Sequence, residues 1–244
     1  MLRTLVVAFS LFSVSLNIYA LEGAVKPKVT PMESPETYML VGNSYTYYSS
    51  GLNNIINGLA KANNTPIRRN RMVTIGGSGL GWFSVWELVR PSGMAAAYAD
   101  PKDGGKIKRY DFTKEKVFDA VVLQDNSAGA INPQRKDAFE KFAKQHSYDL
   151  RCFGIQPLLM MTWARKNQPE MTAQLAEATT KVGNEGNAMV IPVGLAFVEA
   201  IKLDPKLELF RDDQTHPSPE GTYLAGCVTF ATMFHQSPVD LPFS

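Results

Sequence analysis

The sequence contains few of the residues that build metal centres and disulfide frameworks. Its 244 residues include only two cysteines and three histidines, and no series of His, Cys, Asp and Glu shows the spacing of a zinc site. The sequence therefore predicts no metal site. Cys152 and Cys227 could form a disulfide in an oxidising compartment or remain as two buried thiols, and the sequence leaves both alternatives open. Neither lies in a Gly-rich turn, so neither is expected to be a catalytic nucleophile.

An excess of charge of one sign is also missing. The chain has 25 Lys and Arg against 23 Asp and Glu, a formal net charge of +2. This balance does not favour nucleic acid or an anionic membrane as a partner. After the first twenty residues, no apolar run approaches the roughly 20 residues that a membrane-spanning helix needs. These two absences are compatible with a small-molecule or glycan partner, and they leave the oligomeric state open.

The N-terminal segment has the pattern of a secretory signal peptide. Arg3 supplies a positive charge, an apolar run interrupted only by serines covers residues 5–16, and the small residue Ala20 follows. We predict a signal peptide over residues 1–20, cleavage near Ala20 and export to the periplasm or the medium. The alternative is an uncleaved amphipathic anchor. Residues 21–35 carry three prolines and no periodicity, which predicts a linker.

The remaining chain, residues 36–244, alternates short apolar runs with segments of helical spacing. This alternation predicts an α/β fold with a mostly parallel sheet covered on both faces. The expected strands cover residues 38–41, 72–75, 118–123, 157–162 and 188–193, and the expected helices lie around residues 52–60, 139–143, 168–186, 195–200 and 221–234. Residues 90–116 form an unusually long interval between two strands. Such an interval is either a functional lid or a solvated surface excursion.

In a parallel α/β sheet, ligands bind beyond the carboxyl ends of the strands, so the residues after each apolar run are the candidates. Ser44 follows the first run at a strand-to-helix turn, where the helix N-terminus favours a developing anion. The alternative is that Ser44 only caps the helix. The Gly-x-Ser-x-Gly elbow of α/β-hydrolases is absent, because position 46 is Thr.

Asp213 and His216 strengthen the nucleophile interpretation of Ser44. A serine hydroxyl needs a base, and the base needs a group that fixes its tautomer. Asp and His three residues apart in one polar turn can supply both, although they could instead cap the following helix or bind a metal. The other histidines, His146 and His235, are expected to be surface residues.

Two further positions could stabilise an oxyanion. Gly76 offers a backbone N–H without side-chain cover at the end of the second predicted strand, and Asn126 could add a side-chain amide after the third. The alternative is that both residues simply serve tight turns.

These blocks, in this order, resemble the SGNH (GDSL-like) hydrolase superfamily. Residues 42–44 (Gly-Asn-Ser) resemble its Gly-Asp-Ser block with Asn in place of Asp, and residues 76–79 (Gly-Gly-Ser-Gly) resemble its second block. Residues 213–218 (Asp-Gln-Thr-His-Pro-Ser) resemble its final Asp-x-x-His block. The resemblance spans residues 37–235.

The third block departs from the superfamily pattern. The usual Gly-x-Asn-Asp is replaced by Leu-Gln-Asp-Asn-Ser at residues 123–127. This segment is similar to the Leu-Gln-Glu-x-Ser segment of bacterial SGNH subfamilies that have no settled substrate. Either Asn126 or Gln124 could therefore supply the amide donor of the oxyanion hole.

The resemblance implies one three-layer α/β/α domain, flavodoxin-like, that hydrolyses esters without a cofactor. It implies that Ser44 attacks the ester carbonyl, that His216 takes the Ser44 proton and that Asp213 orients and stabilises His216. We then expect activity to fall as His216 becomes protonated.

Predicted export and the lack of a large apolar surface signal favour small acyl groups, such as acetyl esters on carbohydrate. Trp82, Trp86 and Trp163 follow strand ends, where their rings could stack on a sugar or could serve ordinary packing. We assign Trp82 and Trp163 as candidate substrate-binding residues. Two alternatives are an exported non-catalytic carbohydrate-binding protein on the same fold and a lipase or phospholipase of the same superfamily.

Overall fold

The computed structural model of the chain describes residues 25–29, 33–90, 97–100, 104, 106–109 and 116–242. The predicted signal peptide lies outside the described residues, as does part of the predicted linker. No helix in the described ranges has the length and apolar composition that crossing a membrane requires.

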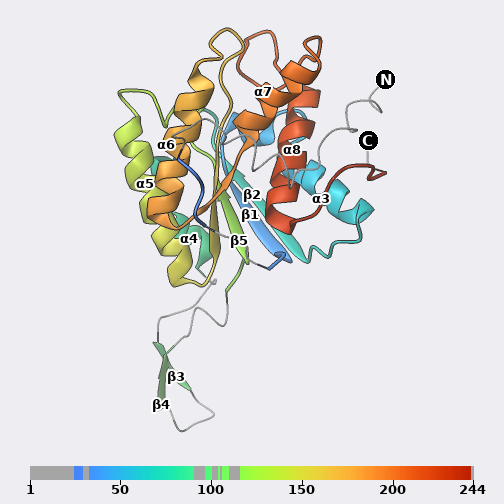
Figure 1. The fold of residues 1–244 in the computed structure, drawn as a ribbon. Helices are drawn as coiled ribbons and strands as arrows, with labels where there is room; N and C mark the ends of the chain where they lie inside the picture. Colours follow the sequence, from blue (N-terminus) through green and yellow to red (C-terminus); the bar gives the residue numbers. More distant parts are fainter. Residues whose placement is uncertain are drawn as a thin grey trace.

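A five-stranded sheet forms the centre of the fold (Figure 1). All of its neighbouring strands pair in parallel, in the order β2-β1-β5-β6-β7. This confirms the predicted α/β class and parallel sheet. The strands are β1 (Thr37–Gly42), β2 (Arg69–Thr74), β5 (Ala120–Leu123), β6 (Gln156–Met160) and β7 (Met189–Ile191). The strand order reverses at β1, so the carboxyl ends of β1 and β5 flank the position where such sheets bind ligands.

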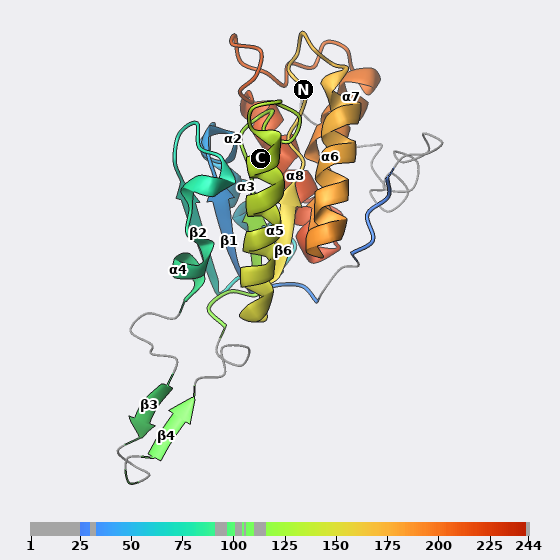
Figure 2. The same ribbon diagram turned by 90° about the vertical axis from the view of Figure 1, so that its left-hand side faces the viewer.

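Helices cover both faces of the sheet (Figures 1 and 2). One layer contains α3 (Leu52–Ala62), α7 (Val193–Leu203) and α8 (Pro219–Phe234), and the other contains α4 (Val85–Val89), α5 (Lys136–Cys152) and α6 (Met171–Gly186). Successive β1 side chains alternate between the two layers, because Leu40 joins the first core cluster while Met39 and Val41 join the second.

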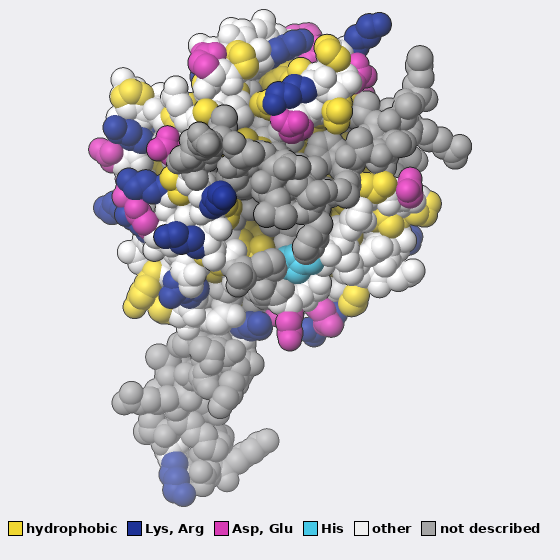
Figure 3. All heavy atoms as spheres, in the orientation of Figure 1, with side chains coloured by type: hydrophobic (Ala, Val, Ile, Leu, Met, Phe, Trp, Pro, Cys, Tyr) yellow, Lys and Arg dark blue, Asp and Glu magenta, His cyan; other side chains and the backbone are white. Residues whose placement is uncertain are grey.

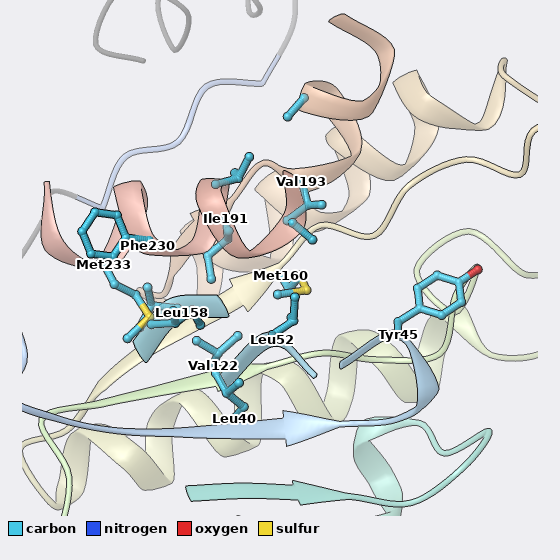
Figure 4. Packing of buried hydrophobic residues seen from close by; sticks show 14 of the residues in the cluster. Leu40, Tyr45, Leu52, Val122, Leu158, Met160, Ile191, Val193, Phe230 and Met233 are labelled. Carbon is cyan, nitrogen blue, oxygen red and sulfur yellow. The ribbon is translucent and has the colours of Figure 1, made fainter. Parts of the chain in front are cut away.

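Helix α3 illustrates why these segments become helices. Leu52, Ile56, Leu59 and Ala60 recur at helical spacing and are all buried, while Lys61 is exposed. Burial of each large aliphatic side chain stabilises the fold by about 1.5–3 kcal/mol relative to leaving it exposed. Figure 4 shows part of the cluster between the sheet and this helical layer, with side chains from β1, β5, β6 and β7 facing α8.

The interval over residues 90–116 contains an antiparallel pair, β3 (Ala97–Asp100) and β4 (Lys106–Arg109). In Figure 2 this pair lies beyond the end of the sheet opposite to α2 (Ser44–Tyr47). The two strands therefore do not cover the carboxyl edge, as a lid would, and residues 91–96, 101–103, 105 and 110–115 lie outside the described residues.

The two cysteines occupy opposite faces of the sheet. Cys152 ends α5 and is exposed, and Cys227 lies within α8, partly buried against the other layer. Both are free thiols. Figure 3 shows basic and acidic side chains intermingled over one face of the molecule, in keeping with the balanced charge of the sequence.

Candidate active site

Ser44 begins the short helix α2 directly after β1. The N-cap of α2 is Asn43, whose side-chain oxygen accepts a hydrogen bond from the N–H of Tyr45 at 3.1 Å. The Ser44 side chain is thus not used as a cap, in contrast to the alternative considered from the sequence. Its Oγ instead lies 2.8 Å from Nε2 of His216.

Asp213 and His216 lie in one tight turn that is held by its own hydrogen bonds. Oδ1 of Asp213 accepts hydrogen bonds from the N–H groups of Thr215 (3.0 Å) and His216 (2.8 Å), and its Oδ2 lies 2.5 Å from Nδ1 of His216. Gln214 adopts φ 61° within the turn, and the N–H of Arg211 donates to the carbonyl of His216 at 2.9 Å. One carboxylate therefore fixes both the loop and the imidazole.

The pKa of Asp213 lies below its ordinary value. Partial burial raises this pKa, but the hydrogen bonds from the backbone N–H groups of His216 and Thr215 and from the imidazole together lower it by more. The carboxylate is therefore ionised at neutral pH. It accepts the Nδ1 proton of His216, so Nε2 is the nitrogen that faces Ser44.

Two aromatic rings from the Ser44 turn surround the imidazole. The Tyr45 ring meets His216 edge-on at 5.6 Å between centroids, and the Tyr48 ring lies at 4.4 Å. The guanidinium of Arg211 lies over the Tyr48 ring at 5.3 Å. Sequence reasoning missed both tyrosines, although their positions one and four residues after Ser44 are a usable signal.

Gly76 lies in an exposed turn beyond the end of β2. The N–H of Ile75 donates to the carbonyl of Gly42 at 3.1 Å, so this turn leaves β2 beside the start of the Ser44 turn. Gly77 adopts φ 71°, a conformation that favours glycine. The structure thus places Gly76 on the same edge as Ser44.

Gln124 and Asn126 occupy different environments after β5. Gln124 is 1% exposed; its side-chain oxygen accepts from the N–H of Asn43 (2.9 Å) and from the Thr46 hydroxyl (2.8 Å), and its amide N–H donates to the Asp125 carbonyl. Asn126 is only partly buried, and its amide donates to the Gly77 carbonyl at 3.4 Å. The Gln124 amide is thus buried and paired within its own segment, whereas the Asn126 amide is accessible and lies beside the Gly76 turn.

Comparison with solved structures identifies the architecture. The chain superimposes on a candidate SGNH hydrolase from Slackia heliotrinireducens with a TM-score of 0.56 and 21% identity, over 84% of this chain and 100% of the other. The chain has the SGNH hydrolase fold. An acetylxylan esterase variant from Geobacillus stearothermophilus gives a TM-score of 0.59 at 14% identity, covering 86% of this chain and 99% of that one.

A third similar structure is an esterase from Pseudoalteromonas sp., with a TM-score of 0.53, 10% identity, and 81% and 96% of the two chains covered. No family profile matches the sequence, and no curated protein matches it. At these identities the structural likeness establishes the fold, so activity has to be argued from the site. Among the residues that the structure describes, no group of three or more His, Cys, Asp or Glu could hold a metal ion.

Within this SGNH fold, Asn43 links three separate blocks of the site. It is 2% exposed, and its side-chain amide donates to the carbonyls of Ser78 (2.8 Å) and Asp125 (3.1 Å). An Asp at this position could not make these two donations. Asn43, which stands in place of the usual Asp, therefore supplies the two N–H donors that these carbonyls need. The sequence shows this replacement, but its structural role was not predicted from it.

Asp125 forms the second part of this buried network. Its carboxylate accepts a hydrogen bond from the N–H of Leu80 at 2.6 Å and another from the N–H of Asn126. Burial raises the pKa of Asp125, and these two backbone hydrogen bonds lower it by less. The carboxylate thereby ties the segment after the Gly76 turn to the segment that carries Asn126.

Two sequence-based expectations differ from the structure. Trp163 is 1% exposed, and its ring is stacked between those of Tyr45 and Phe197 at 4.4 and 4.5 Å, so neither face is available to a sugar. Trp82, by contrast, is 66% exposed in the turn η2 (Leu80–Trp82). His146 is not a surface residue, because it is 4% exposed and its Nε2 lies 3.0 Å from the Leu80 carbonyl.

Proposed function

We propose that this protein is a serine-dependent carboxylic ester hydrolase that works through an acyl-enzyme. The observation that carries the proposal is the continuous series of hydrogen bonds from Ser44 Oγ through His216 to Asp213. It lies at the carboxyl edge of a parallel sheet, where this class of fold binds ligands. The distant structural similarity to SGNH esterases supports the same reaction class.

The proposed reaction has two halves. His216 Nε2 takes the proton of Ser44 as the hydroxyl oxygen attacks the ester carbonyl carbon, and the tetrahedral intermediate collapses as the alcohol leaves with that proton. Water, deprotonated by His216, then attacks the acyl carbon; as the bond to Ser44 Oγ breaks, His216 returns the proton to that oxygen and the acid is released. Asp213 remains ionised and stabilises the imidazolium that forms in each half.

We assign the oxyanion hole to the backbone N–H groups of Ser44 and Gly76 and the side-chain amide of Asn126. The exposure of the Gly76 turn and the contact of Asn126 with the Gly77 carbonyl support this assignment. Gln124 is left out because its amide is buried and paired. Loss of one oxyanion donor lowers kcat by roughly 100- to 1,000-fold in well-studied hydrolases. We therefore expect a loss of that order for Asn126→Ala and none of that size for Gln145→Ala, which removes an exposed amide on α5.

We propose small acyl groups on carbohydrate, above all acetyl, as the substrate class. Similarity to the structures of two acetylxylan esterases supports this choice. Trp82, exposed in the turn that follows the Gly76 block, offers a ring on which a sugar could stack. We keep the predicted export after cleavage near Ala20 as part of the proposal, because polymeric glycans lie outside the cytoplasm. The proposed mechanism uses no cofactor.

Hydrolysis of p-nitrophenyl acetate by the purified protein tests the reaction class. We expect Ser44→Ala and His216→Ala to abolish turnover, and His235→Ala, an exposed histidine at the end of α8, to retain it. Retention of wild-type turnover by Ser44→Ala would refute the serine mechanism. Equal background rates in all four proteins, together with glycan binding that survives Ser44→Ala, would favour the non-catalytic binding protein.

Acetate release from acetylated xylan tests the substrate class. We expect Trp82→Ala to raise KM for the glycan while leaving hydrolysis of p-nitrophenyl acetate unchanged, because only the glycan reaches the ring. Absence of acetate release above the Ser44→Ala background would exclude acetylated xylan. A rate that rises with acyl chain length from acetate to octanoate would instead favour the lipase alternative.

A further inference from the structure

Thr215, the residue before His216, is held by two aromatic side chains. Its hydroxyl forms a hydrogen bond with the phenol oxygen of Tyr45, and its carbonyl accepts a hydrogen bond from the indole N–H of Trp163 at 2.9 Å. The backbone N–H of Thr215 is bonded to Asp213. All three polar groups of this residue are therefore occupied, although it lies in an otherwise exposed loop.

The Tyr45 ring is itself fixed in place. It is buried and lies parallel to the Trp163 ring, at 4.4 Å between centroids and an angle of 5°, while Trp163 stacks in the same way on Phe197 of α7. In Figure 4, Tyr45 lies at the edge of the core cluster with its phenol oxygen directed away from the aliphatic side chains. Burial raises the pKa of Tyr45, so the phenol keeps its proton over the neutral and mildly alkaline range.

This arrangement joins the two reacting groups through their sequence neighbours. Tyr45 directly follows Ser44, and Thr215 directly precedes His216, so one hydrogen bond between Tyr45 and Thr215 spans the 170 residues that separate the two turns. A displacement of about 1 Å between reacting groups can lower a rate by about 100-fold. The contact between Tyr45 and Thr215 therefore bears on the alignment of Ser44 Oγ with His216 Nε2.

We propose that the hydrogen bond between Tyr45 and Thr215, supported by the hydrogen bond that Trp163 donates to Thr215, holds His216 within hydrogen-bond distance of Ser44. We call this contact the Tyr45–Thr215 latch. Tyr45 and Thr215 are positioning residues, because their hydroxyl groups bind each other and neither binds Ser44 Oγ or the His216 imidazole. The inference rests on the proposed esterase function. It also gives Trp163 a role, since its indole N–H holds the Thr215 carbonyl.

The decisive variants are Thr215→Val, which removes only the hydroxyl, and Thr215→Ser, which retains it. We expect Thr215→Val and Tyr45→Phe each to lower kcat for p-nitrophenyl acetate by about 10- to 100-fold with KM nearly unchanged. The double variant should lose no more than Tyr45→Phe alone, because Tyr45→Phe already removes the bond that Thr215→Val removes. Thr215→Ser should recover most of the rate. Tyr148→Phe, which removes the hydroxyl of an exposed tyrosine on α5, is the matched control.

A readout independent of turnover separates this proposal from the esterase proposal. The proton on Nδ1 of His216, bonded to Asp213, should give a downfield NMR resonance that shifts or broadens in Thr215→Val and Tyr45→Phe. It should be retained in Thr215→Ser and Tyr148→Phe. The latch proposal would be wrong if the losses in kcat multiply in the double variant, or if Thr215→Val and Thr215→Ser behave equally in both assays. Either result would count against the latch even if the loss of turnover in Ser44→Ala supports the esterase function. An unchanged resonance in all variants would do the same if the protein shows no turnover.

Discussion

The buried amide of Asn43 provides the sharpest test of how the site is assembled. Asn43→Asp preserves the size of the side chain and the oxygen that caps α2, but it replaces an N–H₂ group by an oxygen. That oxygen would face the carbonyls of Ser78 and Asp125, which now accept hydrogen bonds at 2.8 and 3.1 Å. The side chain is 2% exposed, so bulk water does not reach that oxygen.

The magnitude follows from the groups left without partners. Each buried carbonyl that loses its donor costs about 1–3 kcal/mol, so we expect the free energy of unfolding to fall by about 2–6 kcal/mol at neutral pH. The effect should depend on pH. Burial against two carbonyls would hold the pKa of the new carboxyl above its ordinary value of about 3.9. Because the folded state then retains a proton that the unfolded state has lost, the destabilisation should grow as pH rises above about 4.

Urea unfolding at pH 5 and pH 8, followed by circular dichroism, measures this prediction. The difference in midpoint between variant and wild type should be larger at pH 8, with the slope m unchanged. Asn54→Asp, the same chemical change at an exposed position of α3, should stay within about 0.5 kcal/mol of wild type. A variant as stable as wild type at both pH values would show that the Asn43 network does not support the site.

Three further predictions concern other parts of the fold. Burial lowers the pKa of His146 below its ordinary value of 6.5. The unfolded state therefore takes up the proton first, and the free energy of unfolding falls as pH drops through 6.5. His146→Gln should reduce this dependence of stability on pH, measured by urea unfolding between pH 7 and 5. Exposed Cys152 should react rapidly with a thiol reagent under native conditions, whereas Cys227, whose pKa burial raises to about 12, should react only on unfolding; equal rates would contradict this assignment. Gly81→Ala would place a methyl group 2.5 Å from the Phe142 ring, and we expect a loss of about 1–3 kcal/mol by thermal unfolding, with unchanged stability as the refuting result.

The sequence predicted the fold class because each element carries a local signal. The apolar runs that become β1, β5, β6 and β7 are buried in parallel strands, and the segments of helical spacing between them become α3, α5 and α6. The residues that follow the apolar runs can be recognised in the same way, so the sequence predicts Ser44 and Gly76 on one edge of the sheet, together with the Asp213–His216 turn. Strand boundaries differ by up to three residues, as for the second strand, which is predicted over 72–75 and covers Arg69–Thr74.

Side-chain environments were less predictable because they depend on residues distant in the chain. His146 has polar and charged sequence neighbours, yet α5 places it against the Leu80 carbonyl. Trp163 follows a strand end, as a ligand-stacking residue would, but α7 supplies the ring that covers its second face. The composition of a segment does not reveal which other segment packs on it.

The sequence by itself determined an α/β chain with a nucleophile, base and acid candidate at the ends of its elements, because these features follow from periodicity and residue type. Only the tertiary structure shows that the Asn126 amide lies beside the Gly76 turn, whereas Gln124 is buried and bonded to the N–H of Asn43. It also brought Tyr45 to Thr215, a contact across 170 residues. Such contacts depend on strand order and helix packing, which satisfy buried polar groups over the whole fold and leave no trace in local sequence spacing.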